Sequence, residues 1–140
     1  MLCLVLASFF AVSDSQSNQK APSREQQAQA AAQVPVMDGG AGPCGLELTV
    51  RDSDSKPVYD ATVKVHIAYG FAGAHRLDLQ AGTNAGGKVK FTGIPARVHR
   101  PPLEFNATKD RLEGSVAYDP TSECQAKHDL TLQKPKPQEP

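Results

Sequence analysis

The chain of 140 residues contains no tryptophan, few aromatic residues (6%) and no excess of either charge. Lys plus Arg and Asp plus Glu number 15 each, which argues against a nucleic-acid-binding protein that depends on bulk positive charge. No apolar run reaches the roughly 20 residues of a membrane-spanning helix. Cys-x-x-Cys and Gly-x-Ser-x-Gly motifs are also absent. We therefore predict no catalytic residues, no cofactor, no nucleic-acid partner and no transmembrane segment.

An apolar run does occupy residues 2–12, and it has the length of the hydrophobic region of a secretory signal. Small residues at 11 and 13 suit a signal peptidase, which places cleavage near Ser13. No Lys or Arg precedes the run. We predict a signal peptide at 1–13 and a secreted or periplasmic protein. The alternative is that 2–12 forms a buried element of the fold.

Two segments lack the apolar residues needed for a core. Residues 14–43 are rich in Gln, Ala, Ser and Gly, and we predict a disordered linker there. Residues 134–140 alternate Pro with polar residues, which is typical of an extended tail. The folded unit is therefore expected at 44–133.

Within 44–133, apolar and polar residues alternate with a period of two, which indicates half-buried strands. The whole chain has eleven Gly and eleven Pro, which is typical of a turn-rich β-type protein, and turn signals separate the expected strands about every ten residues. The strands we expect are 46–50, 61–69, 77–81, 88–92, 103–107, 116–118 and 130–132. This pattern predicts an all-β fold, a seven-stranded Greek-key β-sandwich.

The same alternation assigns the two faces of the strands. The inward-facing residues that we expect in the core are Val63, Val65, Ile67, Phe91 and Phe105. The outward-facing residues that we expect to be exposed are Lys64, Lys88 and Lys90.

Two segments carry strand and turn patterns in a fixed order, residues 48–65 (LTVRDSDSKPVYDATVKV) and residues 83–95 (TNAGGKVKFTGIP). The first resembles the first strand, turn and second strand of carboxypeptidase regulatory-like and related transthyretin-like sandwich domains, and the second resembles a later turn and strand of the same family. Ser55 and Asp60 stand where the family usually has Gly. The resemblance implies a transthyretin-like or immunoglobulin-like sandwich, and such domains are commonly non-catalytic modules of secreted or cell-envelope proteins.

Two enzyme classes with related folds are not expected. Hydroxyisourate hydrolases end in Tyr-Arg-Gly-Ser, whereas this chain ends in Lys-Pro-Lys-Pro-Gln-Glu-Pro. Intradiol dioxygenases share a Pro-Val-x-x-Ala-x-Val strand pair, but they are longer and need paired Tyr and His iron ligands. We therefore predict a non-enzymatic exported module that binds a protein or a glycan at the cell envelope. A third interpretation is that the domain is purely a structural spacer.

Cys44 and Cys124 flank the folded unit and are the two cysteines that remain after removal of a signal containing Cys3. In an exported protein such a pair usually forms a disulfide, which we predict. Two free thiols or a metal-binding pair are the alternatives.

Four histidines suggest an alternative function, that of a small periplasmic metal-binding protein. Its ligands would be His75 and His128, joined by His66 or His99, and it requires the third and last predicted strands to be neighbours. No two of these residues have a His-x-His or His-x-x-x-His spacing. The alternative to a metal ligand is that each of the four is an ordinary surface histidine.

Arginines near two predicted loops form a candidate anion-binding patch. Its members are Arg76, Arg97 and Arg100, with His99 beside them. Such a group holds anions where the side chains converge, and is otherwise an ordinary solvated rim.

Overall fold

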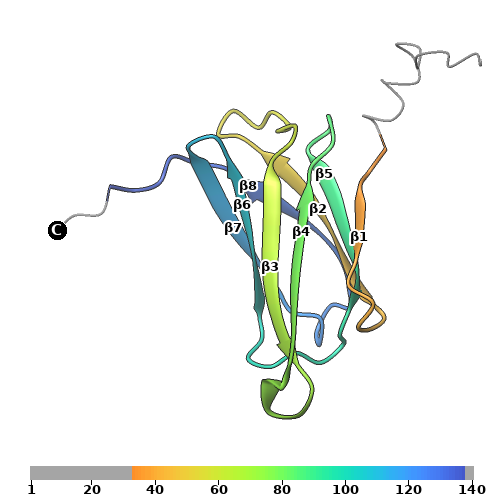
Figure 1. Ribbon diagram of the computed structural model, residues 1–140. Coiled ribbons are helices and arrows are strands. Elements are labelled where there is room, and N and C mark those ends of the chain that lie inside the picture. The colour runs from red at the N-terminus through yellow and green to blue at the C-terminus, as the bar shows by residue number, and fades with distance from the viewer. Residues whose placement is uncertain (1–32, 138–140) are drawn as a thin grey trace, which may run out of the picture.

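The computed structural model describes residues 33–137, and the predicted signal peptide lies outside them. Two four-stranded sheets pack face to face as a β-sandwich (Figure 1). The strands are β1 (Val36–Asp38), β2 (Cys44–Arg51), β3 (Thr62–Tyr69), β4 (His75–Gly82), β5 (Lys88–Ile94), β6 (Leu103–Lys109), β7 (Leu112–Tyr118) and β8 (Gln125–Thr131). A short 3-10 turn, η1 (Phe71–Gly73), joins β3 to β4. Among the described residues, no helix is long and apolar enough to cross a membrane.

The first sheet has the order β1-β5-β2-β8, and the second has the order β4-β3-β6-β7. In the first sheet β2 pairs antiparallel with β5 and parallel with β8, while β1 pairs parallel with β5. The second sheet is antiparallel throughout. Along one side of the sandwich, Glu113 and Gln133 exchange two backbone hydrogen bonds of 2.9 Å between the two sheets.

The core lies between the sheets and is formed by the residues that alternate inward. The predicted core residues are confirmed: Val63, Ile67, Phe91 and Phe105 are fully buried and Val65 is 3% exposed. The rings of Phe91 and Phe105 meet edge to face across the two sheets, with centroids 5.2 Å apart. Alternation alone therefore placed these side chains correctly.

Two predictions need correction, namely the number of strands and the exposure of Lys90. All seven predicted strands are present, but the structure has eight. The additional strand, β1, lies in the stretch 14–43 that we expected to be a linker, and its Met37 packs against the core. Lys90 is half-buried because it lies on the outer face of the first sheet in a shallow hollow, together with its partner Glu47 on β2 and Lys127 on β8. Lys64 and Lys88 are exposed as predicted. The Greek-key connectivity stays a prediction.

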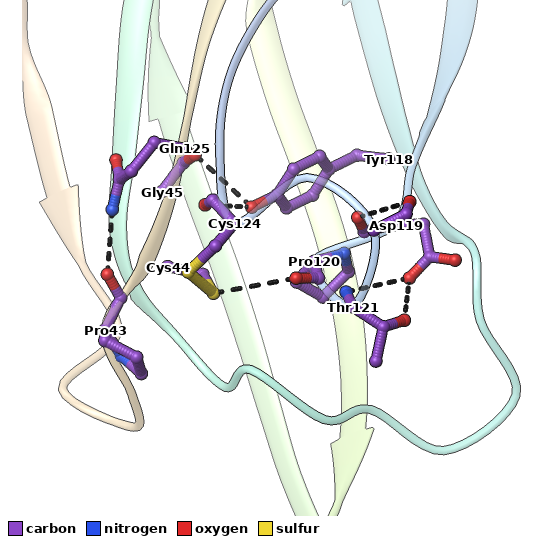
Figure 2. Close-up of a disulfide and its surroundings, with 10 residues drawn as sticks. Pro43, Cys44, Gly45, Tyr118, Asp119, Pro120, Thr121, Cys124 and Gln125 are labelled. Carbon is purple, nitrogen blue, oxygen red and sulfur yellow. Dashed lines mark hydrogen bonds between the residues drawn. A yellow bond between two sulfur atoms is a disulfide. The ribbon is translucent and has the colours of Figure 1, made fainter.

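A disulfide joins the start of β2 to the residue before β8 (Figure 2). The predicted pair, Cys44 and Cys124, is bonded in the structure with Cα atoms 4.6 Å apart. Beside it, the Tyr118 hydroxyl donates to the Cys124 carbonyl at 2.6 Å and lies 3.3 Å from the Gly45 carbonyl. Burial raises the pKa of Tyr118 to about 12, with smaller contributions from the carboxylates of Glu123 and Asp119. The end of the sandwich is thus fixed by a covalent bond and a buried phenol.

The loops gather at the two ends of the sandwich (Figure 1). One end, called here the hairpin end, carries the turn between β3 and β4, the segment 95–102 before β6, and the loop 119–124. The opposite end carries the β2–β3 loop, the β4–β5 turn and the β6–β7 turn. The candidate site lies at the hairpin end.

Candidate anion-binding site

A polar hollow of about 460 Å³ opens on the outer face of the second sheet at the hairpin end. Its floor comes from β3 and β4, and its walls come from η1 and the 99–104 segment. The lining residues are His66, Ala68, Ala72, Gly73, Arg76, His99, Arg100, Pro102, Leu103 and Glu104. Strand alternation places His66 and Arg76 on this face, because their neighbours Ile67 and Leu77 point toward the core.

A chain of hydrogen bonds holds one arginine at the hollow. The Nδ1 of His66 lies 2.5 Å from the Asp78 carboxylate, to which it is paired across β3 and β4. The Nη1 of Arg76 lies 3.4 Å from the Nε2 of the same imidazole. With a proton on Nδ1 directed at Asp78, Nε2 accepts from the guanidinium. Asp78 thus orients His66, and His66 orients Arg76.

The opposite wall is attached to β3 by backbone hydrogen bonding. The His99 N–H donates to the Ala68 carbonyl at 2.7 Å, and Val98 pairs with Tyr69 in an isolated bridge. The His99 ring also packs closely against η1, so closely that a Cβ added at Gly73 would lie 2.9 Å from it. The rim is therefore built by contacts that fix both His99 and the turn.

Two residues of the rim have left-handed backbone conformations although neither is glycine. Ala72 has φ 54° and Arg100 has φ 56°. Such conformations cost on the order of 1 kcal/mol or more and are common at ligand sites. Arg100 lines the hollow, so this backbone conformation occurs at the candidate site itself.

The lining carries two guanidinium groups, two imidazoles and the carboxylate of Glu104, and the Asp78 carboxylate lies beside it against His66. With the histidines counted as neutral, the two arginines are matched by two carboxylates, so the N–H donors of the arginines, rather than a net positive charge, are what the hollow offers to an anion. The side chains are exposed, so each single charge contributes little in water, while converging charges contribute together. Guanidinium groups bind carboxylates and phosphates through parallel N–H donors. The hollow therefore has the chemistry of a small anion site.

The structure brings together part of the predicted arginine patch. Arg76 and Arg100 line the hollow, whereas Arg97 is exposed on the neighbouring segment outside the lining. Asp78 and Glu104 were missed by the sequence reasoning. Asp78 had one available signal, which is its polar position between Leu77 and Leu79 in a predicted strand.

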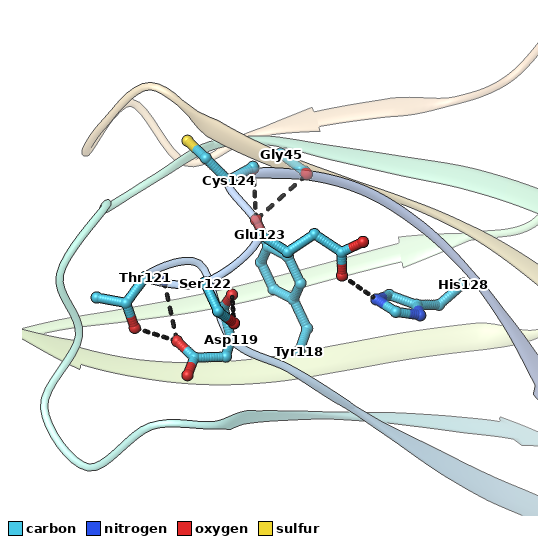
Figure 3. A network of polar contacts seen from close by, with 8 residues as sticks. All are labelled: Gly45, Tyr118, Asp119, Thr121, Ser122, Glu123, Cys124 and His128. Atoms are coloured by element: carbon cyan, nitrogen blue, oxygen red, sulfur yellow. Dashed lines mark hydrogen bonds and ion pairs between the residues drawn. The ribbon is translucent and has the colours of Figure 1, made fainter.

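The histidines do not form the predicted metal site. His75 belongs to β4 and His128 to β8, and these two strands lie in different sheets. The metal site required them to be neighbours, and they are not. The His75 ring stacks on Tyr69, with centroids 5.2 Å apart. His128 has its Nε2 3.1 Å from the Glu123 carboxylate, beside Tyr118 (Figure 3). Across 33–137, no three His, Cys, Asp or Glu side chains are placed to hold a metal ion.

No protein-family model matches the chain, and no curated protein sequence matches it. Solved structures similar to it include 3-chlorocatechol 1,2-dioxygenase from Rhodococcus opacus 1CP, at 14% identity and a TM-score of 0.47, over 73% of this chain and 64% of that one. Catechol 1,2-dioxygenase from Pseudomonas arvilla C-1 matches at 14% identity and a TM-score of 0.46, over 76% and 60% of the two chains. Hydroxyquinol 1,2-dioxygenase from Pseudomonas putida DLL-E4 matches at 10% identity and a TM-score of 0.44, over 74% and 63%.

These matches contradict our prediction of a non-enzymatic module for protein or glycan binding at the cell envelope, because the similar structures are enzymes. That prediction is withdrawn, together with its metal-binding alternative. The matches carry no activity over to this chain, because the identities are 10–14% and the TM-scores are 0.44–0.47. The likeness concerns the β-sandwich fold alone.

Proposed function

We propose that the chain binds a small anionic ligand, carrying a carboxylate or a phosphate, in the hollow at the hairpin end. The observation that carries the proposal is the convergence of Arg76, Arg100, His66 and His99 on one concave site. The hydrogen bonds from Asp78 through His66 to Arg76 support it, because they hold a guanidinium in place before a ligand arrives. The open, solvated setting favours weak binding, in the millimolar to submillimolar range.

Titration of the isotope-labelled chain with inorganic phosphate, and separately with acetate, tests the proposal. We expect amide and side-chain resonances of residues 66, 76, 99 and 100 to shift along one binding curve. Arg76→Gln should weaken binding about tenfold, the usual scale for loss of one charge-assisted contact. Arg111→Gln, in the β6–β7 turn at the opposite end, is the matched control and should leave the affinity unchanged. Shifts centred elsewhere, or an equal effect of both variants, would refute the site.

We also infer that the domain belongs with the carboxypeptidase regulatory-like and transthyretin-like sandwiches. Backbone geometry supports this inference at the two positions where the sequence departs from the family pattern. Ser55 has φ 63° and Asp60 has φ 56°, which are conformations that favour the glycine usual in the family. Ser55→Gly should therefore stabilise the fold slightly, by about 0.5 kcal/mol, in urea unfolding. Destabilisation by more than about 0.5 kcal/mol would count against the alignment.

The disulfide supports an exported location, because such bonds persist in oxidising compartments. Fractionation of the source cells, with an antibody against the folded domain, tests this location. Recovery of the protein only in the reduced form from the cytosol would contradict it.

A further inference from the structure

The turn between β3 and β4 is an apolar tip at the most protruding point of the hairpin end (Figure 1). Its five residues, Gly70-Phe-Ala-Gly-Ala74, include no polar side chain. Phe71 is 94% exposed, far more than the other exposed large apolar residues described, Tyr59 at 61% and Val36 at 60%. Turns usually carry polar residues, and an aromatic ring in water adds nothing to the core. The ring of Phe71 therefore has no role in holding the described fold together.

The tip nevertheless has a defined shape. Gly70, Ala72 and Gly73 have φ of 79°, 54° and 70°, so three of its five residues have a positive φ. The Gly73 N–H donates to the Gly70 carbonyl at 3.2 Å, and the Ala74 N–H donates to the Phe71 carbonyl at 3.1 Å. At its base, Tyr69 stacks on His75. The turn is thus held in a conformation that presents an aromatic ring outward.

Basic residues surround the tip. The two segments that form it and its neighbour, 68–76 and 95–102, contain three Arg and two His and no Asp or Glu. Three acidic residues of the adjoining elements have partners: Asp78 pairs with His66, the Asp119 carboxylate accepts from Thr121, and Glu123 pairs with His128 (Figure 3). Glu104 lines the hollow together with Arg100. An exposed aromatic ring flanked by arginines is the combination that binds to the interface of an anionic bilayer.

We propose that the hairpin tip docks on a membrane surface containing anionic lipids. Phe71 enters the boundary between headgroups and acyl chains, and Arg97 and Arg100 contact lipid phosphates. One inserted ring and a few cations give weak, reversible attachment. The proposal differs from ligand binding in the hollow, because Phe71 and Arg97 are outside its lining, while Arg100 takes part in both.

The absence of tryptophan from the chain provides a direct test. Phe71→Trp places one fluorophore at the tip, and Tyr59→Trp places one in the β2–β3 loop at the opposite end. Each full-length variant is mixed with vesicles of phosphatidylcholine alone or of phosphatidylcholine with one quarter phosphatidylglycerol. We expect emission from position 71 to shift to shorter wavelength with the anionic vesicles, and emission from position 59 to stay unchanged. The apolar run at 2–12 is common to both variants and cannot produce a difference between them.

Sedimentation with the same vesicles measures the contributions of the ring and the charge. Phe71→Ser should lower the partition coefficient at least tenfold, and Arg97→Glu should do so by a similar factor at 50 mM salt. The controls, Tyr59→Ser and Arg111→Glu, should stay within twofold. Equal binding to both kinds of vesicle, or equal effects of tip and control variants, would overturn the proposal. Phosphate binding in solution without vesicle binding would also overturn it, while leaving the hollow as an anion site.

Discussion

Phe91 and Phe71 are the same residue type in opposite environments, which makes them a matched pair for testing the described core. Phe91 is 0% exposed and contacts Phe105 across the sheets, whereas Phe71 is 94% exposed. Phe91→Ala removes the transfer free energy of a buried ring, about 1.5–3 kcal/mol, and an edge-to-face contact of about 0.5–1.5 kcal/mol. The cavity left behind adds to this loss. The expected total is about 3–5 kcal/mol.

Urea unfolding followed by circular dichroism gives the free energy of unfolding for both variants. For a folded unit of this size the loss at Phe91 corresponds to a fall in melting temperature of about 20 °C. Phe71→Ala should change stability by less than about 0.5 kcal/mol. If Phe91→Ala is too unstable to fold, Phe91→Leu should still fold and lose about 1–1.5 kcal/mol. A loss below about 1 kcal/mol for Phe91→Ala, or a larger loss at Phe71 than at Phe91, would refute the assignment of faces.

Replacing Cys44 and Cys124 together by Ala should cost about 4–5 kcal/mol in denaturant unfolding, since the bond closes a loop with a sequence separation of 80; an unchanged midpoint would contradict this. The raised pKa of Tyr118 favours the folded state below pH 10 and ceases to do so as the pH rises toward 12, because the unfolded chain releases this proton first. The stability difference between the native chain and Tyr118→Phe should therefore narrow by up to about 2 kcal/mol over that interval, and a constant difference would count against it. Gly87→Ala should destabilise the fold by more than about 2 kcal/mol in thermal unfolding, because the added Cβ would lie 2.3 Å from the Val50 carbonyl oxygen at a residue with φ +73°. Gly40→Ala is the control: its φ is +63° but nothing lies within 4 Å of the added Cβ, so its cost should be about 1 kcal/mol.

The strands were predictable from the sequence because their signal is local. Alternation between Val63, Val65 and Ile67 and their polar neighbours identifies a strand and its inward face without any knowledge of the partner. β1 was not predictable in this way, since three residues contain too little alternation and its pairing with β5 depends on a distant part of the chain. Lys90 was assigned incorrectly because its burial depends on neighbours from other strands, such as Glu47 of β2, which alternation does not reveal.

The candidate site was only partly predictable, because it depends on which strands become neighbours. The pattern identified Arg76 and Arg100 as basic residues near loops, but periodicity does not reveal that His66 faces Asp78 across β3 and β4. The same limitation produced the wrong metal hypothesis. It required the strands of His75 and His128 to be neighbours, whereas the sheet order separates them. Sequence spacing therefore predicts which face of a strand a residue occupies, but it does not predict which distant strands become neighbours.

The disulfide also determines how the domain would carry a mechanical load applied at residues 33 and 137. β2 begins at Cys44, and β8 begins at the residue after Cys124 and runs parallel beside it. Tension would therefore pass from the segment before β2 across the sulfur–sulfur bond and along β8, which is already extended. The strands between the two cysteines lie outside this path. In the reduced domain, unfolding under load would add the 80-residue separation to the path, about 270 Å of extensible chain. The oxidised domain is thus a short, nearly inextensible link.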